Sequence, residues 1–456
     1  MHESLATDLY EATMAANYVR RGMTGRATFS LFTRRLPEQR GFLVAAGLAD
    51  AVDRLLAFEL TGVDVIALAD QLGCPRSLLS PLQGMRFTGD VWAVPEGRVV
   101  LADEPLLEVT APLPEAQFVE TLVLNAVCYQ TLLASKAARC VLAAEGRPVV
   151  DFSLRRAHGE EAGLHAARAA AIAGFVATSN VAAALRYGLR ATGTMAHSYV
   201  QAFPSEEEAF RAFATDFPAA PVFLVDTFDL ADGVHAAARV IEELGLADRA
   251  AIRIDSGDIE RAARTGRAIL DEHGLRQVRI VASGGLDELL IDRCVRRGVP
   301  IDVFAVGTRF GVSADAPVLD AAYKLVQVDE RLTMKLSPGK ATAPGAKQVF
   351  RRPHYDDLLG LRGEPVPADG EPLLVPIMRA GRLVSPPDPL AAAQKRCTAD
   401  LMALPPTARQ LRNPVPTTCR WTERLTAIAA EVRAALRSPV AGERPEPSGR
   451  EEVPAP

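Results

Sequence analysis

Short apolar runs alternate with longer amphipathic segments between residues 147 and 310. The runs are rich in β-branched residues, which is typical of the buried strands of a parallel sheet. The segments between them repeat apolar residues at helical spacing, and several have acidic residues in the first turn and end at glycine. This pattern predicts strands at residues 148–154, 174–180, 191–197, 221–229, 250–258, 278–285 and 300–308.

Seven consecutive βα units predict a TIM-like α/β barrel, with an open doubly wound sheet as the alternative. Every predicted strand ends on polar or glycine residues. A barrel gathers the carboxyl ends of its strands at one rim, which is where the active sites of such barrels lie. We therefore expect an active site at the strand C-termini of a barrel that spans residues 146–330.

The flanking segments have a different pattern and predict a separate α+β unit. Residues 1–145 combine a helical stretch at 114–145 with a β-rich stretch at 87–112. Residues 331–437 contain turns, short strands and a final helix. The tail at 438–456 is rich in Pro, Glu and Gly and has few apolar residues, so it is predicted to be disordered.

Composition narrows the functional classes. The chain has 456 residues, 48% of them hydrophobic, and a net charge of −5, which is too small to suggest nucleic-acid or polybasic membrane binding. The amino terminus lacks the pattern of a signal peptide, and no apolar run of about 18 residues occurs, so a cytoplasmic protein is expected. Six cysteines without a CxxC motif predict reduced thiols, and no metal-ligating residues are assigned.

Two groups of residues at the strand ends have side chains that could take part in catalysis or substrate binding. His197 in GTMAHS lies at the carboxyl end of a predicted strand, unlike the other histidines. In IRIDSGD, strand alternation places Arg253 and Asp255 on the same face, so that a cation and an anion point together into the barrel mouth. This pair is either a substrate clamp or a structural ion pair.

Glycine-rich strand ends and one arginine complete the expected site. The tripeptides at 283–285 and 306–308 let backbone N–H groups approach a phosphate, and the late loops of a barrel often bind one. Arg155 follows the first barrel strand and is suited to bind an aromatic acid. Together these residues predict a site for a phosphorylated sugar and an anionic partner.

Several motifs then resemble the nicotinate phosphoribosyltransferase family, in chain order from residue 7 to about residue 437. They are TDLYEATMA (7–15), LLASKAAR (132–139), FSLRRAHG (152–159), GTMAHSYV (193–200), RIDSGDI (253–259) and AVGTRF (305–310). The resemblance implies an irregular seven-stranded α/β barrel plus an α/β sandwich domain, to which residues 331–437 return. It also implies transfer of 5-phosphoribosyl from phosphoribosyl pyrophosphate to nicotinate, giving nicotinate mononucleotide and pyrophosphate, with ATP as co-substrate and Mg²⁺ as cofactor.

The resemblance also implies roles for individual residues. His197 would be phosphorylated by ATP, and Asp255 would lie near the ribose. Tyr10 would stack on the pyridine ring from the neighbouring subunit, with Asp8 close by, so that the active site spans a homodimer interface. Arg155 and Arg253 would hold the nicotinate carboxylate and the ribosyl phosphate region. Further substrate and phosphate contacts would come from Thr178, Gly193, Ser198, Ser283, Gly284, Gly285, Gly307, Thr308, Lys136 and Arg139.

Other functions are open alternatives. Nicotinamide and quinolinate phosphoribosyltransferases share the fold. The resemblance implies a carboxylate that accepts the amide N–H in a nicotinamide enzyme, and the segment ATSN (177–180) lacks one. Quinolinate enzymes are much shorter and have a more basic pocket. A Schiff-base aldolase is disfavoured because none of the predicted barrel strands contains a lysine. A non-catalytic relative that binds phosphoribosyl pyrophosphate is disfavoured because His197, Asp8, Tyr10 and the RIDSGD run are all present.

Overall fold

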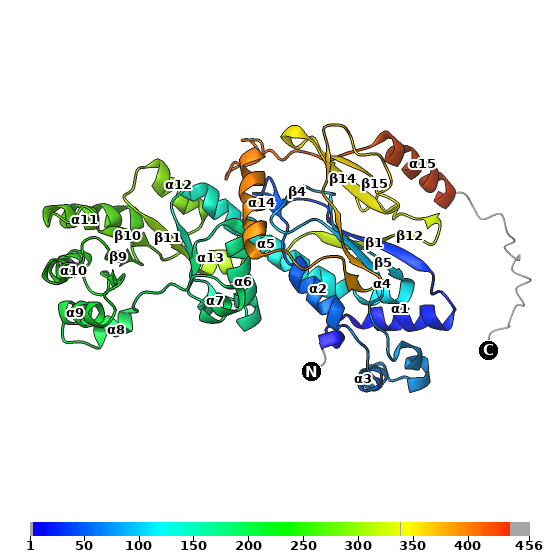
Figure 1. Ribbon diagram of the computed structural model, residues 1–456, viewed down its shortest axis with the longest axis horizontal. Coiled ribbons are helices and arrows are strands. Elements are labelled where there is room, and N and C mark those ends of the chain that lie inside the picture. Colours follow the sequence, from blue (N-terminus) through cyan, green and yellow to red (C-terminus); the bar gives the residue numbers. More distant parts are fainter. Residues whose placement is uncertain (1–2, 338, 438–456) are drawn as a thin grey trace, which may run out of the picture.

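The computed structural model describes residues 3–337 and 339–437, so the tail predicted to be disordered, 438–456, lies outside the described residues. Figure 1 shows two α/β regions side by side along the long axis of the molecule. A parallel sheet with its helices forms one end, and antiparallel sheets form the other. Each region has its own large apolar core.

Six of the seven predicted barrel strands form one parallel sheet in the order β7-β6-β11-β10-β9-β8. Most of their residues are buried, as expected for strands that are covered on both faces. They are shorter than the predicted runs: β6 (Val149–Asp151), β7 (Ala177–Thr178), β8 (Val222–Leu224), β9 (Ala251–Ile254), β10 (Arg279–Ala282) and β11 (Val303–Val306).

The remaining predicted strand, at 191–197, is not a strand in the structure. A single parallel bridge joins Ala191 to Thr178 of β7. Beyond it, the Arg253 side chain contacts this segment, since its guanidinium donates to the Thr194 hydroxyl at 2.7 Å and to the Met195 carbonyl at 3.4 Å. The segment therefore contacts a side chain from inside the sheet instead of extending the backbone ladder.

The helices of this region follow the strands along the chain. Three of them begin at an aspartate that caps the helix and closely follows a strand: Asp229 before α10, Asp258 before α11 and Asp287 before α12. The helices are α6 (Glu160–Ala173), α7 (Val181–Tyr187), α8 (His197–Gln201), α9 (Glu206–Asp216), α10 (Leu230–Leu244), α11 (Ile259–Glu272), α12 (Glu288–Arg296) and α13 (Thr308–Gly311).

The other region is built around a seven-stranded sheet in the order β13-β12-β1-β5-β3-β17-β18. Strands from both ends of the chain pair in it, because β1 (Arg26–Thr33) lies between β5 (Pro105–Pro112) and β12 (Ala321–Val328). The remaining strands of the sheet are β3 (Asp90–Ala93), β13 (Arg331–Leu332), β17 (Val375–Arg379) and β18 (Arg382–Leu383).

Smaller sheets and the remaining helices complete this region. The helices are α1 (Leu9–Arg20), α2 (Leu48–Ala57), α3 (Gly62–Leu72), α4 (Leu113–Phe118), α5 (Glu120–Ala144), α14 (Leu390–Ala403) and α15 (Glu423–Arg437). A four-stranded sheet contains β14 (Lys347–Arg351), β15 (Leu358–Leu361), β16 (Glu371–Pro372) and β19 (Arg420–Trp421), and β2 (Leu43–Val44) pairs with β4 (Val99–Val100). The long helix α5 extends from this region to the parallel sheet (Figure 1).

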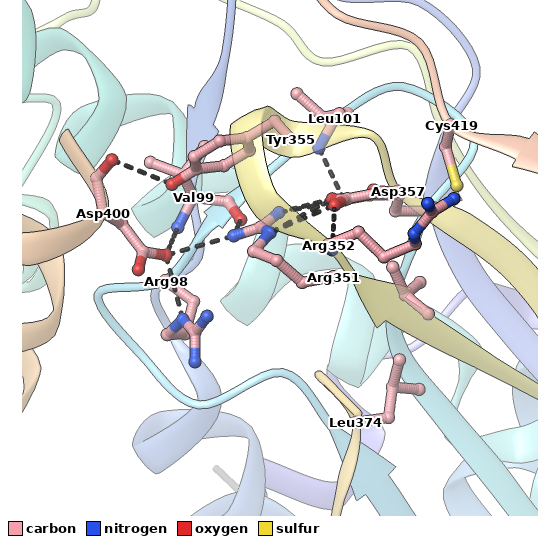
Figure 2. A network of polar contacts seen from close by, with 12 residues as sticks. Arg98, Val99, Leu101, Arg351, Arg352, Tyr355, Asp357, Leu374, Asp400 and Cys419 are labelled. Carbon is pink, nitrogen blue, oxygen red and sulfur yellow. Dashed lines mark hydrogen bonds and ion pairs between the residues drawn. The ribbon is translucent and has the colours of Figure 1, made fainter. Parts of the chain in front are cut away.

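A buried arginine ties the C-terminal segment to the N-terminal one (Figure 2). Arg351 of β14 donates to the Asp357 carboxylate at 2.8 and 3.1 Å and to Asp400 of α14 at 3.2 Å. It also donates to the Val99 carbonyl of β4 at 2.8 Å, and it lies over the Tyr355 ring. A charge this deep in the protein needs such partners, so the network fixes how the two segments pack.

Within the described part of the chain, no helix is both long enough and apolar enough to cross a bilayer.

Candidate active site

An open cavity of about 530 Å³ lies at the carboxyl ends of the parallel strands. Five of the candidate residues line it: His197, Arg253, Asp255, Arg155 and Gly193. Phe152, Leu154, Ser179, Thr194, Met195, Ala196 and Leu224 complete the lining. The wall therefore combines apolar surface with a few charged groups, which is typical of small-molecule sites.

Arg253 and Asp255 form a rigid pair at the end of β9. The Arg253 guanidinium donates to Asp255 Oδ1 at 2.8 Å and to the Ser283 hydroxyl at 2.8 Å. The Ser283 hydroxyl in turn donates to Asp255 Oδ1 at 2.5 Å. Phe152 lies beside the guanidinium, 5.4 Å from it. Arg253 is buried, so its orientation is fixed before any ligand binds.

His197 is the first residue of α8 and is partly exposed to the cavity. Its Nδ1 lies 3.1 Å from the Thr227 hydroxyl, which follows β8. Its Nε2 lies 3.8 Å from Asp255 Oδ2. The imidazole is therefore oriented by a hydroxyl on one side and lies near a carboxylate on the other.

Asp255 is held in its ionised form. Burial raises the pKa of Asp255, but the Ser283 hydrogen bond and the charges of Arg253 and His197 outweigh burial and leave the pKa below its usual value. Asp226, which follows β8, accepts from the Asp255 N–H at 2.9 Å and from the Ser256 hydroxyl at 2.6 Å. Its other oxygen, Oδ1, is buried without a partner. The rim therefore carries two neighbouring carboxyl groups.

The glycine-rich strand ends approach this pair. Gly284 has φ +80°, and an added Cβ would lie 1.8 Å from the Asp255 carbonyl oxygen, so no other residue fits there without movement. Gly285 follows it directly. Gly307 precedes α13, of which Thr308 is the exposed first residue. An ion pair between Arg309 and Asp287, at 2.5 Å, joins the two loops.

Two predicted ligand contacts have structural partners instead. Ser283 is buried, and its hydroxyl is used by Arg253 and Asp255. Thr178 is also buried, and its hydroxyl donates to Asp151 at 2.7 Å. Its neighbour Ser179 lines the cavity. Ser198 is exposed on α8, next to His197.

Lys136 and Arg139 do not reach the cavity. Both are buried on α5, where Lys136 Nζ lies 2.5 Å from Glu288 and 2.9 Å from Asp315, and Arg139 donates to Glu288 at 3.0 Å. Burial forces each cation to pair with a carboxylate, so neither is available to a phosphate. The pairs attach α5 to the start of α12, directly after the glycine-rich loop at 283–285.

Asp8 and Tyr10 lie at the start of α1, and α1 belongs to the antiparallel region (Figure 1). Neither residue lines the cavity. The side chains of Tyr10 and the neighbouring apolar Leu9 are both exposed, by 45% and 47%. Asp8 accepts from the Thr121 hydroxyl at 2.9 Å. In one chain, therefore, the two halves of the expected site are separate.

A basic group on the same region was not among the predicted site residues. Burial and the charges of Arg34, Lys335 and Lys340 lower the pKa of Lys324 on β12, although Glu120 opposes this at 3.9 Å. Within the described residues, neither Lys335 nor Lys340 has a carboxylate partner. Three of the six lysines of the chain thus lie close together, and the scarcity of lysine was the signal that could have revealed them.

The predicted site also did not include Asp226, Thr227, Phe152 and Ser179, although they border the cavity or hold residues that do. Each of them lies at or just beyond a strand end, as do His197 and Asp255. The polar strand ends were the signal for these residues. Within residues 3–337 and 339–437, no group of three or more His, Cys, Asp or Glu side chains could hold a metal ion.

The chain matches three family models along most of its length. They are the nicotinate phosphoribosyltransferase N-terminal domain (residues 5–128), the nicotinate phosphoribosyltransferase family (148–334) and the nicotinate phosphoribosyltransferase C-terminal domain (347–428).

Curated relatives and solved structures agree with these matches. The chain is 48% identical to nicotinate phosphoribosyltransferase pncB2 of Mycobacterium tuberculosis over 90% of this chain and 89% of the relative. It is 43% identical to nicotinate phosphoribosyltransferase of Bacillus subtilis over 76% of this chain and 73% of the relative. The crystal structure of human nicotinic acid phosphoribosyltransferase superposes with a TM-score of 0.80 at 31% identity, covering 93% of this chain and 99% of that one. The chain therefore belongs to the nicotinate phosphoribosyltransferase family.

Proposed function

We propose that this protein transfers the 5-phosphoribosyl group of phosphoribosyl pyrophosphate to the ring nitrogen of nicotinate, giving nicotinate mononucleotide and pyrophosphate. The observation that carries this proposal is the cavity in which His197, Arg253 and Asp255 meet, in a chain that matches the family models over most of its length. In the proposed reaction the bond from C1 of the ribose to pyrophosphate breaks, and a bond from C1 to the pyridine nitrogen forms.

The charges of the rim suit this reaction. Departure of pyrophosphate leaves positive charge on the ribose ring, and the ionised Asp255 is a preorganised anion that stabilises it. Arg253 holds Asp255 in place and adds positive charge for the phosphate groups. Phe152 and Leu154 supply apolar surface for a flat ring.

The residues support an acid as the acceptor. Arg155 lines the cavity and supplies a cation for a carboxylate. Ser179, the residue of the 177–180 segment that lines the cavity, is neutral, so no carboxylate from this segment is available to bind an amide N–H. Nicotinate is therefore favoured over nicotinamide.

ATP use and Mg²⁺ belong to the same proposal. His197 is the side chain in the cavity that can accept a phosphoryl group on nitrogen, and Thr227 orients its ring. The unpartnered Asp226 Oδ1 and the Asp255 carboxylate fit a Mg²⁺ ion that arrives with phosphate groups, because Mg²⁺ usually binds one or two carboxylates plus substrate oxygens. When bound, Mg²⁺ would neutralise charge on the leaving pyrophosphate.

We further propose that two subunits form each site and that residues 191–197 close the irregular barrel. The exposed Tyr10 and Leu9 on α1 and the lysines near Lys324 of β12 belong to the antiparallel region, whereas the cavity lies at the ends of the parallel strands. An antiparallel arrangement of two chains would bring Tyr10 and these cations to the partner's cavity. The bridge between Ala191 and Thr178 supports the closure.

The test of the activity is direct. Purified protein is incubated with nicotinate, phosphoribosyl pyrophosphate, Mg²⁺ and ATP, and nicotinate mononucleotide is measured by chromatography, with nicotinamide and quinolinate as competing acceptors. We expect product from nicotinate above both others. The absence of product from a folded protein that binds phosphoribosyl pyrophosphate would identify a non-catalytic relative.

The phosphoryl acceptor and the shared site need separate variants. His197→Ala should abolish transfer of ³²P from ATP to the protein, whereas the control His235→Ala, on α10 outside the cavity, should be labelled normally. Labelling of His197→Ala would show that another residue is the acceptor. Co-expressed Tyr10→Ala and His197→Ala chains should regain activity, because each mixed dimer has one intact site, and a lack of recovery would contradict the shared site.

A further inference from the structure

A buried glutamate lies directly beneath the exposed residues of α1. Glu11 is fully buried in the first turn of α1, next to Asp8 and Tyr10 in the sequence. Its Oε1 accepts from the Thr121 N–H at 2.9 Å, at the start of α5, and lies 2.6 Å from the Thr121 hydroxyl oxygen. Its Oε2 accepts from the Thr7 hydroxyl. Glu11 therefore joins α1 to α5.

The Thr121 hydroxyl has a single proton, and this restricts the protonation states of Glu11 and Asp8. The Thr121 hydroxyl oxygen lies 2.6 Å from Glu11 Oε1 and 2.9 Å from Asp8 Oδ2. A hydroxyl has one proton to donate, so it cannot serve two ionised carboxylates at once. Both contacts are hydrogen bonds only if one of the carboxyl groups carries a proton. Glu11 is the buried one and Asp8 the exposed one, so the proton belongs on Glu11.

The surroundings of Glu11 agree with this assignment. The titratable groups that face it are Asp8 and Tyr10 on α1, Glu120 on α5 and Tyr323 on β12. A cation, Lys324, lies 3.9 Å from Glu120. Burial, opposed by the Thr121 and Thr7 hydrogen bonds, raises the pKa of Glu11 to about 7. The negative side chains and burial also raise the pKa of Tyr10, so the phenol stays neutral.

We propose that Glu11 is a positioning residue that carries a proton in the active enzyme and so leaves the Thr121 hydroxyl free to orient Asp8 beside Tyr10. The inference rests on the proposed function, in which Asp8 and Tyr10 contact nicotinate bound in the partner's cavity. Ionised Glu11 competes with Asp8 for the Thr121 proton and repels both Asp8 and Glu120. Loss of this proton therefore weakens nicotinate binding without changing the residues that perform the transfer.

Steady-state kinetics from about pH 6 to about pH 8 test this, because Glu11 ionises within that range. In the unaltered enzyme, KM for nicotinate should rise above pH 7 while kcat changes little. Glu11→Gln has no ionisable group and should keep the low KM at every pH. Thr121→Val should raise KM about tenfold even at the lower pH, the effect of losing one hydrogen bond to a charged group, whereas Thr121→Ser should behave as the unaltered enzyme.

The matched control is Glu115→Gln on α4. Burial also raises the pKa of Glu115, but its hydrogen-bond partner is Thr88, and it has no contact with Thr121 or Asp8 among the hydrogen bonds of the described residues. This variant should keep the pH dependence of the unaltered enzyme. A Glu11→Gln enzyme that retains the rise in KM, or a Thr121→Val enzyme with unaltered KM, would overturn the proposal.

Infrared difference spectroscopy separates this proposal from the proposed function. A carboxylic-acid C=O band that disappears from the unaltered protein as the pH rises through 7, and that Glu11→Gln lacks, is expected whatever the activity. Absence of that band overturns the protonation of Glu11 even if nicotinate mononucleotide is formed. Presence of the band in a protein that forms no nicotinate mononucleotide would overturn the positioning role together with the proposed function.

Discussion

Replacing Gly284 by alanine should displace the Asp255 backbone and reduce turnover. The added Cβ would lie 1.8 Å from the Asp255 carbonyl oxygen, and real Cβ contacts essentially never fall below 3.0 Å, so one of the two segments must move by at least 1.2 Å. The residue also has φ +80°, which costs a non-glycine residue roughly 1–2 kcal/mol. A shift of about 1 Å at reacting groups lowers the rate by roughly 100-fold.

The assay compares kcat for nicotinate mononucleotide formation with the urea midpoint of unfolding. Gly274→Ala is the matched control, because Gly274 has φ +72° but open space around its Cβ position, at the end of α11. This control should lose about 1 kcal/mol of stability and keep its kcat. Equal kcat for both variants would refute the reasoning, because it would mean that the close approach to Asp255 does not position the site.

Three further outcomes are expected. Arg351→Met should lower the free energy of unfolding by about 3–5 kcal/mol in urea titrations, because it leaves buried Asp357 without its cation, whereas the surface control Arg352→Met should lose less than about 1 kcal/mol. Lys136→Met should lower the urea midpoint and leave KM for phosphoribosyl pyrophosphate unchanged, and a raised KM with normal stability would instead support a phosphate contact. Because the folded pKa of Glu11 is raised to about 7, its contribution to stability is fully present below the unfolded pKa of about 4.3 and is lost as pH rises towards and through 7. Glu11→Gln should abolish that part of the pH dependence, and an unchanged profile would contradict it.

Much of the parallel region could be predicted from the sequence. Six strands lie within the predicted runs because apolar β-branched runs between amphipathic helices have few other ways to be buried. The prediction of a strand at 191–197 was wrong. The pattern of this segment alone could not reveal that Arg253 contacts Thr194 and Met195. Which faces of α5 are buried was equally hidden, so Lys136 resembled a phosphate ligand although it pairs with Glu288.

The sequence by itself determined which residue types lie at the strand ends. His197, Arg253 and Asp255 lie at or near the ends of apolar runs, and such runs can be recognised from the spacing of neighbouring residues alone. Only the tertiary structure decided which polar groups meet. The hydrogen bonds of Thr227, Ser283 and Asp226 join residues about 30 positions apart in the chain, and Thr121 meets Asp8 across 113 positions. Such contacts depend on how buried faces pack and on which charges find partners, and neither is set by local spacing.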